Sequence, residues 1–197
     1  MQAAFKVEFV SWGKISNLVH TLANRIHASG YRPDIVVAIA RGGYVPARLL
    51  CDHLDIYNLT SMRISHYTSG AEKGEAARLS MPLNTDIRGL RVLLVDDVGD
   101  TGNTLQLALE HINALHPAEI KIAVLHHKHI SQVVPDFYAQ KIISWRWLTY
   151  PWAIIEDVRG FIRKMEPQPA TAEEALQRLK SEYGLKLPLR IMQDVYR

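Results

Sequence analysis

The sequence predicts an α/β fold built around a parallel, doubly wound sheet. Three short runs of apolar, largely β-branched residues, at 34–40, 91–98 and 119–127, have the composition of strands buried on both faces of such a sheet. Segments with the apolar spacing of helices lie before and between these runs. Strands that alternate with helices are typical of parallel α/β sheets, and this alternation decides the fold class.

The chain has 197 residues, enough for one domain with a sizeable core, or for such a domain with a small appendage. Its 48% apolar and 22% charged residues are ordinary for a globular protein and argue against extensive disorder. The single cysteine, Cys51, allows no intramolecular disulfide. No apolar run is long enough for a membrane helix, and the beginning of the chain lacks the layout of a signal peptide, so we expect a cytoplasmic protein.

The first helix is predicted over residues 11–29, where apolar side chains recur at helical spacing. The first buried strand, 34–40, follows it. This strand leads into the short segment Arg41-Gly42-Gly43, and a second helical stretch then extends to about Leu54.

The middle of the chain continues the alternation. A strand is predicted over 59–67, and the small, polar and glycine-containing segment 68–80 is predicted to be a mobile loop. The buried strand 91–98 is followed by a helix over 101–115 and by the strand 119–127.

The character of the chain changes near residue 164, where prolines interrupt it. We therefore predict a main domain over residues 1–164 and a helical C-terminal appendage over 165–197. Thr171 and Glu174 form the capping-box pattern T-x-x-E at the start of an apolar stripe, which predicts a helix there.

The segment from Val95 to Thr104 carries the chemistry. An apolar strand end is followed by two adjacent acids, Asp96 and Asp97, and by a turn with two glycines and two threonines that enters a helix. Beyond the carboxyl end of a strand, such a turn offers free backbone N–H groups and the positive end of a helix dipole to a phosphate. The acids repel phosphate but accept hydrogen bonds from ribose hydroxyls, and they are ligands that Mg²⁺ takes. The segment therefore predicts a sugar-phosphate site.

Other common sites are disfavoured by the spacing of residues. The chain has no G-x-G-x-x-G after its first strand and no G-x-x-x-x-G-K-[ST], which argues against a dinucleotide fold and a P-loop. The spacing of an EF-hand is not met either. His126, His127 and His129 flank Lys128, but successive strand residues point to opposite faces and cannot all meet one metal ion.

The segment Asp96 to Thr104 resembles the signature of type I phosphoribosyltransferases that binds 5-phosphoribosyl 1-pyrophosphate (PRPP): an apolar strand, two acids and a T-G-x-T turn. The resemblance covers roughly residues 34–160. It implies the type I phosphoribosyltransferase fold with a small hood, and Mg²⁺ as a cofactor at Asp96. The PRPP contacts that it implies are Arg41, Gly42, Asp96, Asp97, Gly99, Asp100, Thr101, Gly102, Asn103 and Thr104.

The end of the first strand resembles the family's pyrophosphate loop. Arg41 offers a fixed fork of donors to phosphate oxygens, and the two glycines after it let the backbone approach the anion. The peptide bond before this arginine is often cis in the family, so we predict a cis bond between Ala40 and Arg41.

The position of Asp100 before Thr-Gly resembles the 6-oxopurine branch, the xanthine-guanine and hypoxanthine-guanine enzymes. The resemblance implies that Asp100 is the general base near the purine N7, and a carboxylate in a dry site is suited to exchange a proton there. It also implies that Lys128 donates to O6. The pattern Trp-x-x-x-Pro-Trp resembles the purine-binding segment of the xanthine-guanine enzymes, which implies that Trp147 lies over the base and the backbone of Leu148 at its edge. Ala153 stands where the bacterial xanthine-guanine enzyme has an acid, so the preferred base stays open.

The leading hypothesis is thus a purine phosphoribosyltransferase that converts PRPP and a 6-oxopurine to a nucleoside monophosphate and pyrophosphate, as a homo-oligomer without a membrane partner. One alternative is transfer to another base, which Asp100 and Lys128 disfavour. The other is a PRPP-binding regulator without catalysis. The segment 165–197 is short and mixed in charge, which disfavours nucleic acid as its partner, while the net charge of +3 says little about it.

Overall fold

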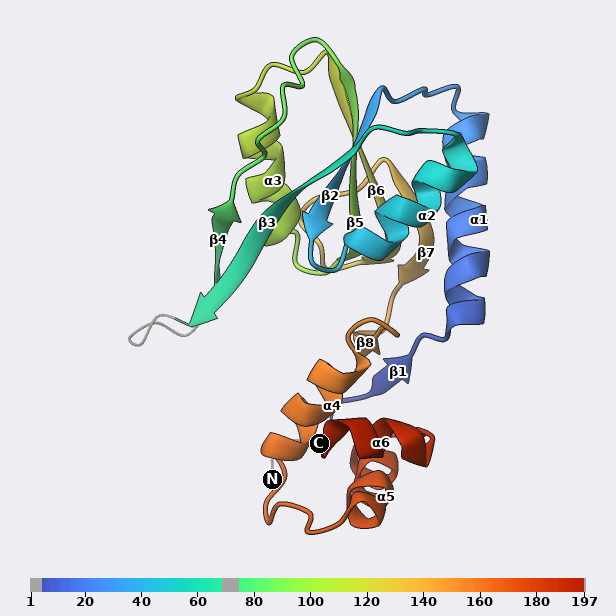
Figure 1. The fold of residues 1–197 in the computed structure, drawn as a ribbon, viewed down its shortest axis with the longest axis vertical. Helices are drawn as coiled ribbons and strands as arrows, with labels where there is room; N and C mark the ends of the chain where they lie inside the picture. Colours follow the sequence, from blue (N-terminus) through green and yellow to red (C-terminus); the bar gives the residue numbers. More distant parts are fainter. Residues whose placement is uncertain (1–4, 69–74, 197) are drawn as a thin grey trace. The chain divides into compact units, whose positions relative to one another are not determined.

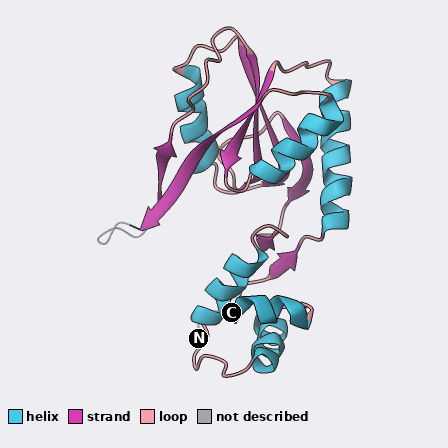
Figure 2. Cartoon of the chain, in the orientation of Figure 1, coloured by secondary structure: helices cyan, strands magenta, loops and turns pink. Residues whose placement is uncertain are grey.

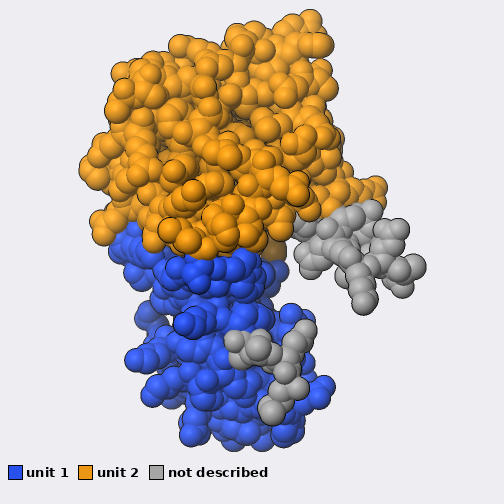
Figure 3. Space-filling view, turned by 180° about the vertical axis from the view of Figure 1, so that it is seen from behind, with its two compact units in different colours: residues 1–15, 144–197 blue, residues 16–143 orange. Residues whose placement is uncertain are grey.

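The computed structural model describes residues 5–68 and 75–196. The chain divides into two compact units (Figure 3). Unit 1 combines Met1–Ile15 with Ser144–Arg197, and unit 2 is Ser16–Ile143. In the described part of the chain, no helix has both the length and the apolar character that crossing a membrane requires.

Unit 2 is built on a six-stranded sheet with the order β4-β3-β2-β5-β6-β7 (Figure 2). Neighbouring strands are parallel except β3 and β4, which are antiparallel, so the sheet is mixed but mostly parallel. The predicted α/β class is confirmed, and the antiparallel strand at the edge is the departure from it. The strands are β2 Ile35–Ala40, β3 Leu59–Thr68, β4 Glu75–Met81, β5 Arg91–Gly99, β6 Glu119–Lys128 and β7 Phe137–Ile142.

Helices cover both faces of this sheet (Figure 1). Helices α1 (Trp12–Ala28) and α2 (Tyr44–Leu54) lie on one side, and α3 (Asn103–Asn113) lies on the other. All six residues of β2 are buried, which explains its uninterrupted apolar sequence. On the α3 side, the core joins apolar side chains of that helix to those of β2, β3, β5 and β6.

The helices and buried strands predicted in unit 2 are confirmed, with small shifts at their ends. Helix α1 begins and ends one residue inside the predicted range 11–29. Helix α3 begins at Asn103 and not at Thr101. The reason is that Thr101 and Gly102 form the turn before the helix, where Gly102 has a φ of 97° that helical residues do not adopt.

The prediction of a loop over 68–80 is wrong in its second half. Residues Glu75–Met81 form β4, which pairs with β3. Ala77 and Leu79 pack against the core of the sheet. A strand with so few large apolar side chains has only a weak period-two pattern, so its sequence looks like a loop. Residues 69–74 of the predicted loop lie outside the described residues.

The described residues of unit 1 form a small sheet and three helices. Strand β1, Val7–Phe9, pairs in parallel with β8, Trp147–Thr149. Helices α4, α5 and α6 share one apolar core. Their bounds are Ile154–Arg163, Ala172–Tyr183 and Leu189–Val195.

Helix α5 begins with the predicted capping pattern. The backbone N–H of Glu174 donates to Oγ1 of Thr171 at 3.2 Å, while the Glu174 carboxylate accepts the N–H of Ala170 at 2.8 Å. The helix ends at Gly184, which has a φ of 70°. The boundary predicted at residue 164 does not coincide with the division into units, because α5 and α6 pack in one core with α4.

Candidate active site

The candidate site of unit 2 lies at the carboxyl ends of β2 and β5, which are neighbours in the sheet. The direction in which successive strands are placed in the sheet reverses between these two strands. Strand β3 follows β2 in the chain and lies on one side of it, whereas β6 follows β5 and lies on the opposite side. Ligands of open α/β sheets bind at such a turning point. The topology therefore brings the loop after β2 beside the turn after β5.

The loop after β2 passes so close to β5 that only glycine fits. A Cβ atom added to Gly42 would lie 2.5 Å from Oδ2 of Asp97, and one added to Gly43 would lie 2.4 Å from a backbone oxygen of β5. The peptide bond between Ala40 and Arg41 is cis, which confirms the prediction. The loop thus holds Arg41 and its backbone beside the second acid of β5.

The two adjacent acids of β5 have different surroundings. Asp96 is 8% exposed, and its Oδ1 accepts the backbone N–H of Asp97 at 2.9 Å. Burial raises the pKa of Asp96 well above its ordinary value, and the charge of Asp97 adds to this. Asp97 lies against Gly42. A cation or sugar hydroxyls at this point would reduce the repulsion between the two carboxylates.

The turn after β5 has the geometry of an anion site. Gly102 adopts a positive φ, and α3 starts at the next residue. The first N–H groups of a helix lack partners within it and lie at the positive end of its dipole. The backbone oxygen of Thr101 accepts the N–H of Gln132 at 2.9 Å, which fixes the turn from outside. Sequence reasoning missed this support, because nothing in the local sequence links Gln132 to the turn.

Asp100 and Lys128 form an ion pair in this site. Lys128, at the end of β6, has a side chain that is 3% exposed, and its Nζ donates to Oδ2 of Asp100 at 2.6 Å. A buried ammonium group needs such a partner. The other oxygen of Asp100, Oδ1, is buried and has no hydrogen-bond partner among the described residues. The pair therefore holds a buried carboxylate oxygen whose capacity to accept a proton or a hydrogen bond is not used by the described residues.

The predicted site residues fall into two groups. Trp147 and Leu148 belong to unit 1, in β8. Leu148 is buried, whereas Trp147 is 38% exposed and its Nε1 donates to Oδ2 of Asp157 at 3.0 Å. The others belong to unit 2, at or just beyond the ends of β2, β5 and β6. They are Arg41, Gly42, Asp96, Asp97, Gly99, Asp100, Thr101, Gly102, Asn103, Thr104 and Lys128.

A metal ion at this site would need oxygen atoms of the bound substrate to complete its coordination. Within residues 5–68 and 75–196, no three His, Cys, Asp or Glu side chains are placed to hold a metal ion. Mg²⁺ in phosphate sites is held by one or two carboxylates together with oxygens of the substrate, and the pair Asp96 and Asp97 fits that arrangement.

His127 is buried with its ring 5.3 Å from that of Tyr138, and burial lowers its pKa.

Comparison with known proteins places this geometry among phosphoribosyltransferases. A family model described as a phosphoribosyl transferase domain matches residues 8–155. Xanthine-guanine phosphoribosyltransferase of Ruegeria sp. (strain TM1040) is 30% identical over 165 residues, which cover 77% of this chain and 90% of that protein.

Solved structures show the same likeness. A purine phosphoribosyltransferase from Pyrococcus horikoshii Ot3 has a TM-score of 0.66 at 34% identity, over 75% of this chain and 93% of that one. Helicobacter pylori xanthine-guanine-hypoxanthine phosphoribosyltransferase shares the fold, with a TM-score of 0.65 at 20% identity, over 79% of this chain and 97% of that one. The match to the family model ends at residue 155, so helices α5 and α6 lie beyond it.

Proposed function

The chain belongs to the phosphoribosyltransferase family, in the branch of the purine enzymes, and from this we propose that it transfers the 5-phosphoribosyl group of PRPP to a 6-oxopurine. The observation that carries the proposal is the pair of Asp100 and Lys128. One oxygen of the carboxylate is held by a buried cation, and the other has no partner among the described residues. A 6-oxopurine protonated at N7 offers an N–H donor and the acceptor O6 side by side, and this pair supplies a carboxylate acceptor to the first and an ammonium donor to the second.

The donor PRPP is proposed to lie along the ends of β2 and β5. Its 5-phosphate is bound by the turn from Thr101 to Thr104, at the start of α3. Asp96 and Asp97 accept hydrogen bonds from the ribose hydroxyls. The pyrophosphate lies at the loop of Arg41 and Gly42, whose backbone approaches β5 closely.

A Mg²⁺ ion is part of this proposal, with Asp96 as its protein ligand. The two adjacent carboxylates, one of them buried, supply the hard oxygen atoms that this ion prefers. Bound Mg²⁺ would offset the negative charge of the pyrophosphate.

In the proposed reaction, N9 of the base forms a bond to C1′ of the ribose while the bond from C1′ to the pyrophosphate oxygen breaks. The electron pair of that bond leaves with the pyrophosphate. The proton on N7 passes to the carboxylate of Asp100, and Lys128 donates to O6. The pattern around Trp147 and its partly exposed ring support stacking on the base, with the backbone of Leu148 at the base edge.

The decisive experiment is incubation of the protein with PRPP, Mg²⁺ and hypoxanthine, guanine or xanthine, each in turn, with adenine and uracil as comparison bases. Formation of the nucleoside monophosphate is followed by chromatography. We expect product with at least one 6-oxopurine, and product with uracil alone would contradict the choice of base.

Asp100→Asn tests the role of the carboxylate. We expect turnover to fall by about 10²–10⁴, because general acid–base help from one group is of that size. Asp52→Asn is the matched control, since Asp52 is an exposed aspartate of helix α2. Full turnover in Asp100→Asn would show that another group accepts the proton.

A further inference from the structure

The indole of Trp147 is held by one face of helix α4. Its Nε1 donates to Oδ2 of Asp157 at 3.0 Å. The ring of Phe161 meets the indole edge-on, with centroids 6.4 Å apart and planes at 85°. Asp157 and Phe161 are four residues apart in α4 and therefore lie on the same helix face. One face thus supplies both a hydrogen-bond acceptor and an aromatic contact to a single side chain.

The backbone of Trp147 is fixed independently of α4. Its N–H donates to the oxygen of Lys6 at 2.9 Å, and Trp147 is paired with Val7 in the ladder between β1 and β8. The remaining freedom of this residue lies in its side-chain torsions, and the outer torsion of tryptophan is intrinsically broad. The contacts from α4, together with the ring of Phe5 at 6.4 Å, therefore decide the orientation of the indole.

Helix α4 is in turn held by the C-terminal helices. The ring of Tyr183 in α5 stacks on Phe161, with centroids 4.9 Å apart. Arg159 donates through Nε and Nη2 to the backbone oxygens of Val195 and Asp194 at the end of α6, at 3.1 and 3.0 Å. A continuous series of contacts thus runs from α5 and α6 through α4 to Trp147.

Asp157 also stabilises its own helix. Like Glu156, it lies in the first turn of α4, where the helix dipole stabilises a negative charge. This role explains why an acid lies in the turn, but it does not explain why the carboxylate is directed at the indole. Burial raises the pKa of Asp157, and the hydrogen bond from Trp147 and the hydroxyl of Thr149 act in the opposite direction, so both stabilise the partly buried charge.

We propose that Asp157 is a positioning residue that orients Trp147 for stacking on the base, and that the C-terminal helices hold Asp157 in place. The inference rests on the proposed function, which assigns Trp147 to the base. It gives residues 165–197, beyond the end of the family match, a role in base binding without contact to the substrate.

The test is steady-state kinetics of Asp157→Ala and Asp157→Asn in the full-length protein. We expect the KM for the purine to rise about tenfold in Asp157→Ala, while kcat and the KM for PRPP change less than about twofold. A loss of that size corresponds to one hydrogen bond to a charged group. Asp157→Asn keeps an acceptor oxygen for the indole N–H and should restore most of the affinity. Asp157→Leu, which is branched at the same atom but has no acceptor, should behave like Asp157→Ala.

A second set of variants distinguishes the positioning of Trp147 by Asp157 from a contribution of Asp157 to the stability of α4. Trp147→Phe keeps an aromatic face but has no N–H, so adding Asp157→Ala to it should leave the KM for the purine unchanged. Glu156→Ala, which removes a charge from the same turn, is the matched control and should leave the KM near its wild-type value. Near-ultraviolet circular dichroism of the free variants gives a readout without activity. The change that Asp157→Ala causes in the tryptophan signal should disappear in the Trp147→Phe background.

The possible failures are distinguishable. If the wild-type protein forms no nucleotide from any base, the proposed function fails and this inference fails with it. If the wild-type protein is active but neither Asp157→Ala nor Asp157→Leu raises the KM for the purine, only this inference is overturned. An equal rise in the wild-type and Trp147→Phe backgrounds would also overturn it, because the effect would not pass through the indole.

Discussion

Lys128 is a charged residue in a place where charges are costly. Its side chain is 3% exposed, and Asp100 supplies the carboxylate at 2.6 Å. Removing one partner of such a pair leaves the other uncompensated, whereas replacing a pair by apolar groups is often harmless to stability. Because the proposed reaction uses both members, the pair must be retained for chemistry whatever it contributes to folding.

Lys128→Met keeps the length of the side chain and removes its charge. We expect kcat/KM for the purine to fall by about 10–10²-fold, because one charge-assisted hydrogen bond to O6 is lost and Asp100 loses its partner. Lys141→Met, at an exposed position of β7, is the control and should keep wild-type kinetics. Measurement of kcat/KM with each base decides the matter, and an unchanged value in Lys128→Met would refute the assignment.

The close approach of Gly42 to Asp97 can be tested by adding a single methyl group to the loop. In Gly42→Ala the new Cβ would lie 2.5 Å from Oδ2 of Asp97, so the carboxylate or the loop must move. We expect kcat/KM for PRPP to fall at least about tenfold, a loss of roughly 1.4 kcal/mol or more in transition-state binding. Gly13→Ala is the control, since its nearest neighbouring atom is 4.0 Å away. Wild-type kinetics in Gly42→Ala would contradict the close approach.

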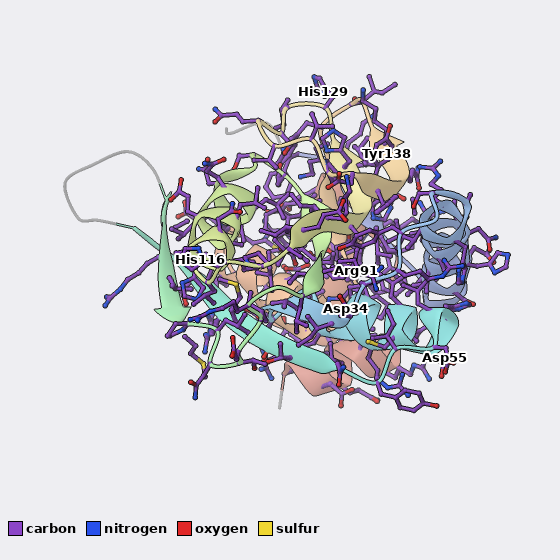
Figure 4. All side chains as sticks on the ribbon, turned by 90° about the horizontal axis from the view of Figure 1, so that it is seen from above. Asp34, Asp55, Arg91, His116, His129 and Tyr138 are labelled. Carbon is purple, nitrogen blue, oxygen red and sulfur yellow. The ribbon has the colours of Figure 1, made fainter. Side chains whose placement is uncertain are left out.

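At the scale of elements, β2 and β5 are joined at both ends. The carboxyl ends carry the site, and at the opposite ends Asp34 accepts hydrogen bonds from Arg91 (Figure 4). These bonds lower the pKa of Asp34 to about 2. The side chains of Asp34 and Arg91 are 36% and 45% exposed, so the contribution of this pair to stability is that of a surface ion pair.

The pH dependence of this pair has a definite sign. Because the pKa of Asp34 is lowered in the folded protein, the stabilisation is present above the ordinary value of 3.8 and is lost as pH falls towards about 2. Asp34→Ala should therefore lose about 0.5–1 kcal/mol near pH 7. Its stability should also decline less than that of the wild type between pH 4 and pH 2. Urea unfolding across this pH range measures both, and parallel profiles for the two proteins would contradict the shift.

Strand β4 is an element that its own sequence did not predict. Its apolar side chains are small or few, and the strand is stabilised by pairing with β3 and by packing of Ala77 and Leu79 against the core. This edge strand needs little apolar surface, because only one of its faces packs on the core, while Arg78 and Ser80 on the other face are exposed. The sequence contrast between β4 and the fully buried β2 follows from these positions.

At the scale of the whole molecule, the proposed ligands should stabilise the folded chain by mass action. PRPP with Mg²⁺ at about 100 times its dissociation constant would add roughly 2.7 kcal/mol. For a chain of this size that raises the unfolding midpoint by about 5–10 °C. Removal of Mg²⁺ with EDTA should abolish most of the shift, as a thermal-shift assay would show. An equal shift without Mg²⁺ would contradict the cofactor assignment.

The sequence alone determined the fold class, the buried strands and the segment Val95 to Thr104. It could do so because a strand buried on both faces is a continuous apolar run, and because the turn proposed to bind a phosphate is built from consecutive residues. The cis bond before Arg41 was predicted from the resemblance of this short loop to the family's pyrophosphate loop. These features depend on neighbours in the chain, so they can be read without knowing what packs against them.

Only the tertiary structure decided which distant residues meet. The contact of Lys128 with Asp100, the approach of Gly42 to Asp97 and the bond from Trp147 to Asp157 each join separate elements. Their partners are set by strand order and helix packing, which the sequence pattern does not specify uniquely. The physical reason is that side-chain contacts between elements depend on register and on the packing of a whole layer, whereas strand and turn signals depend on a few consecutive residues.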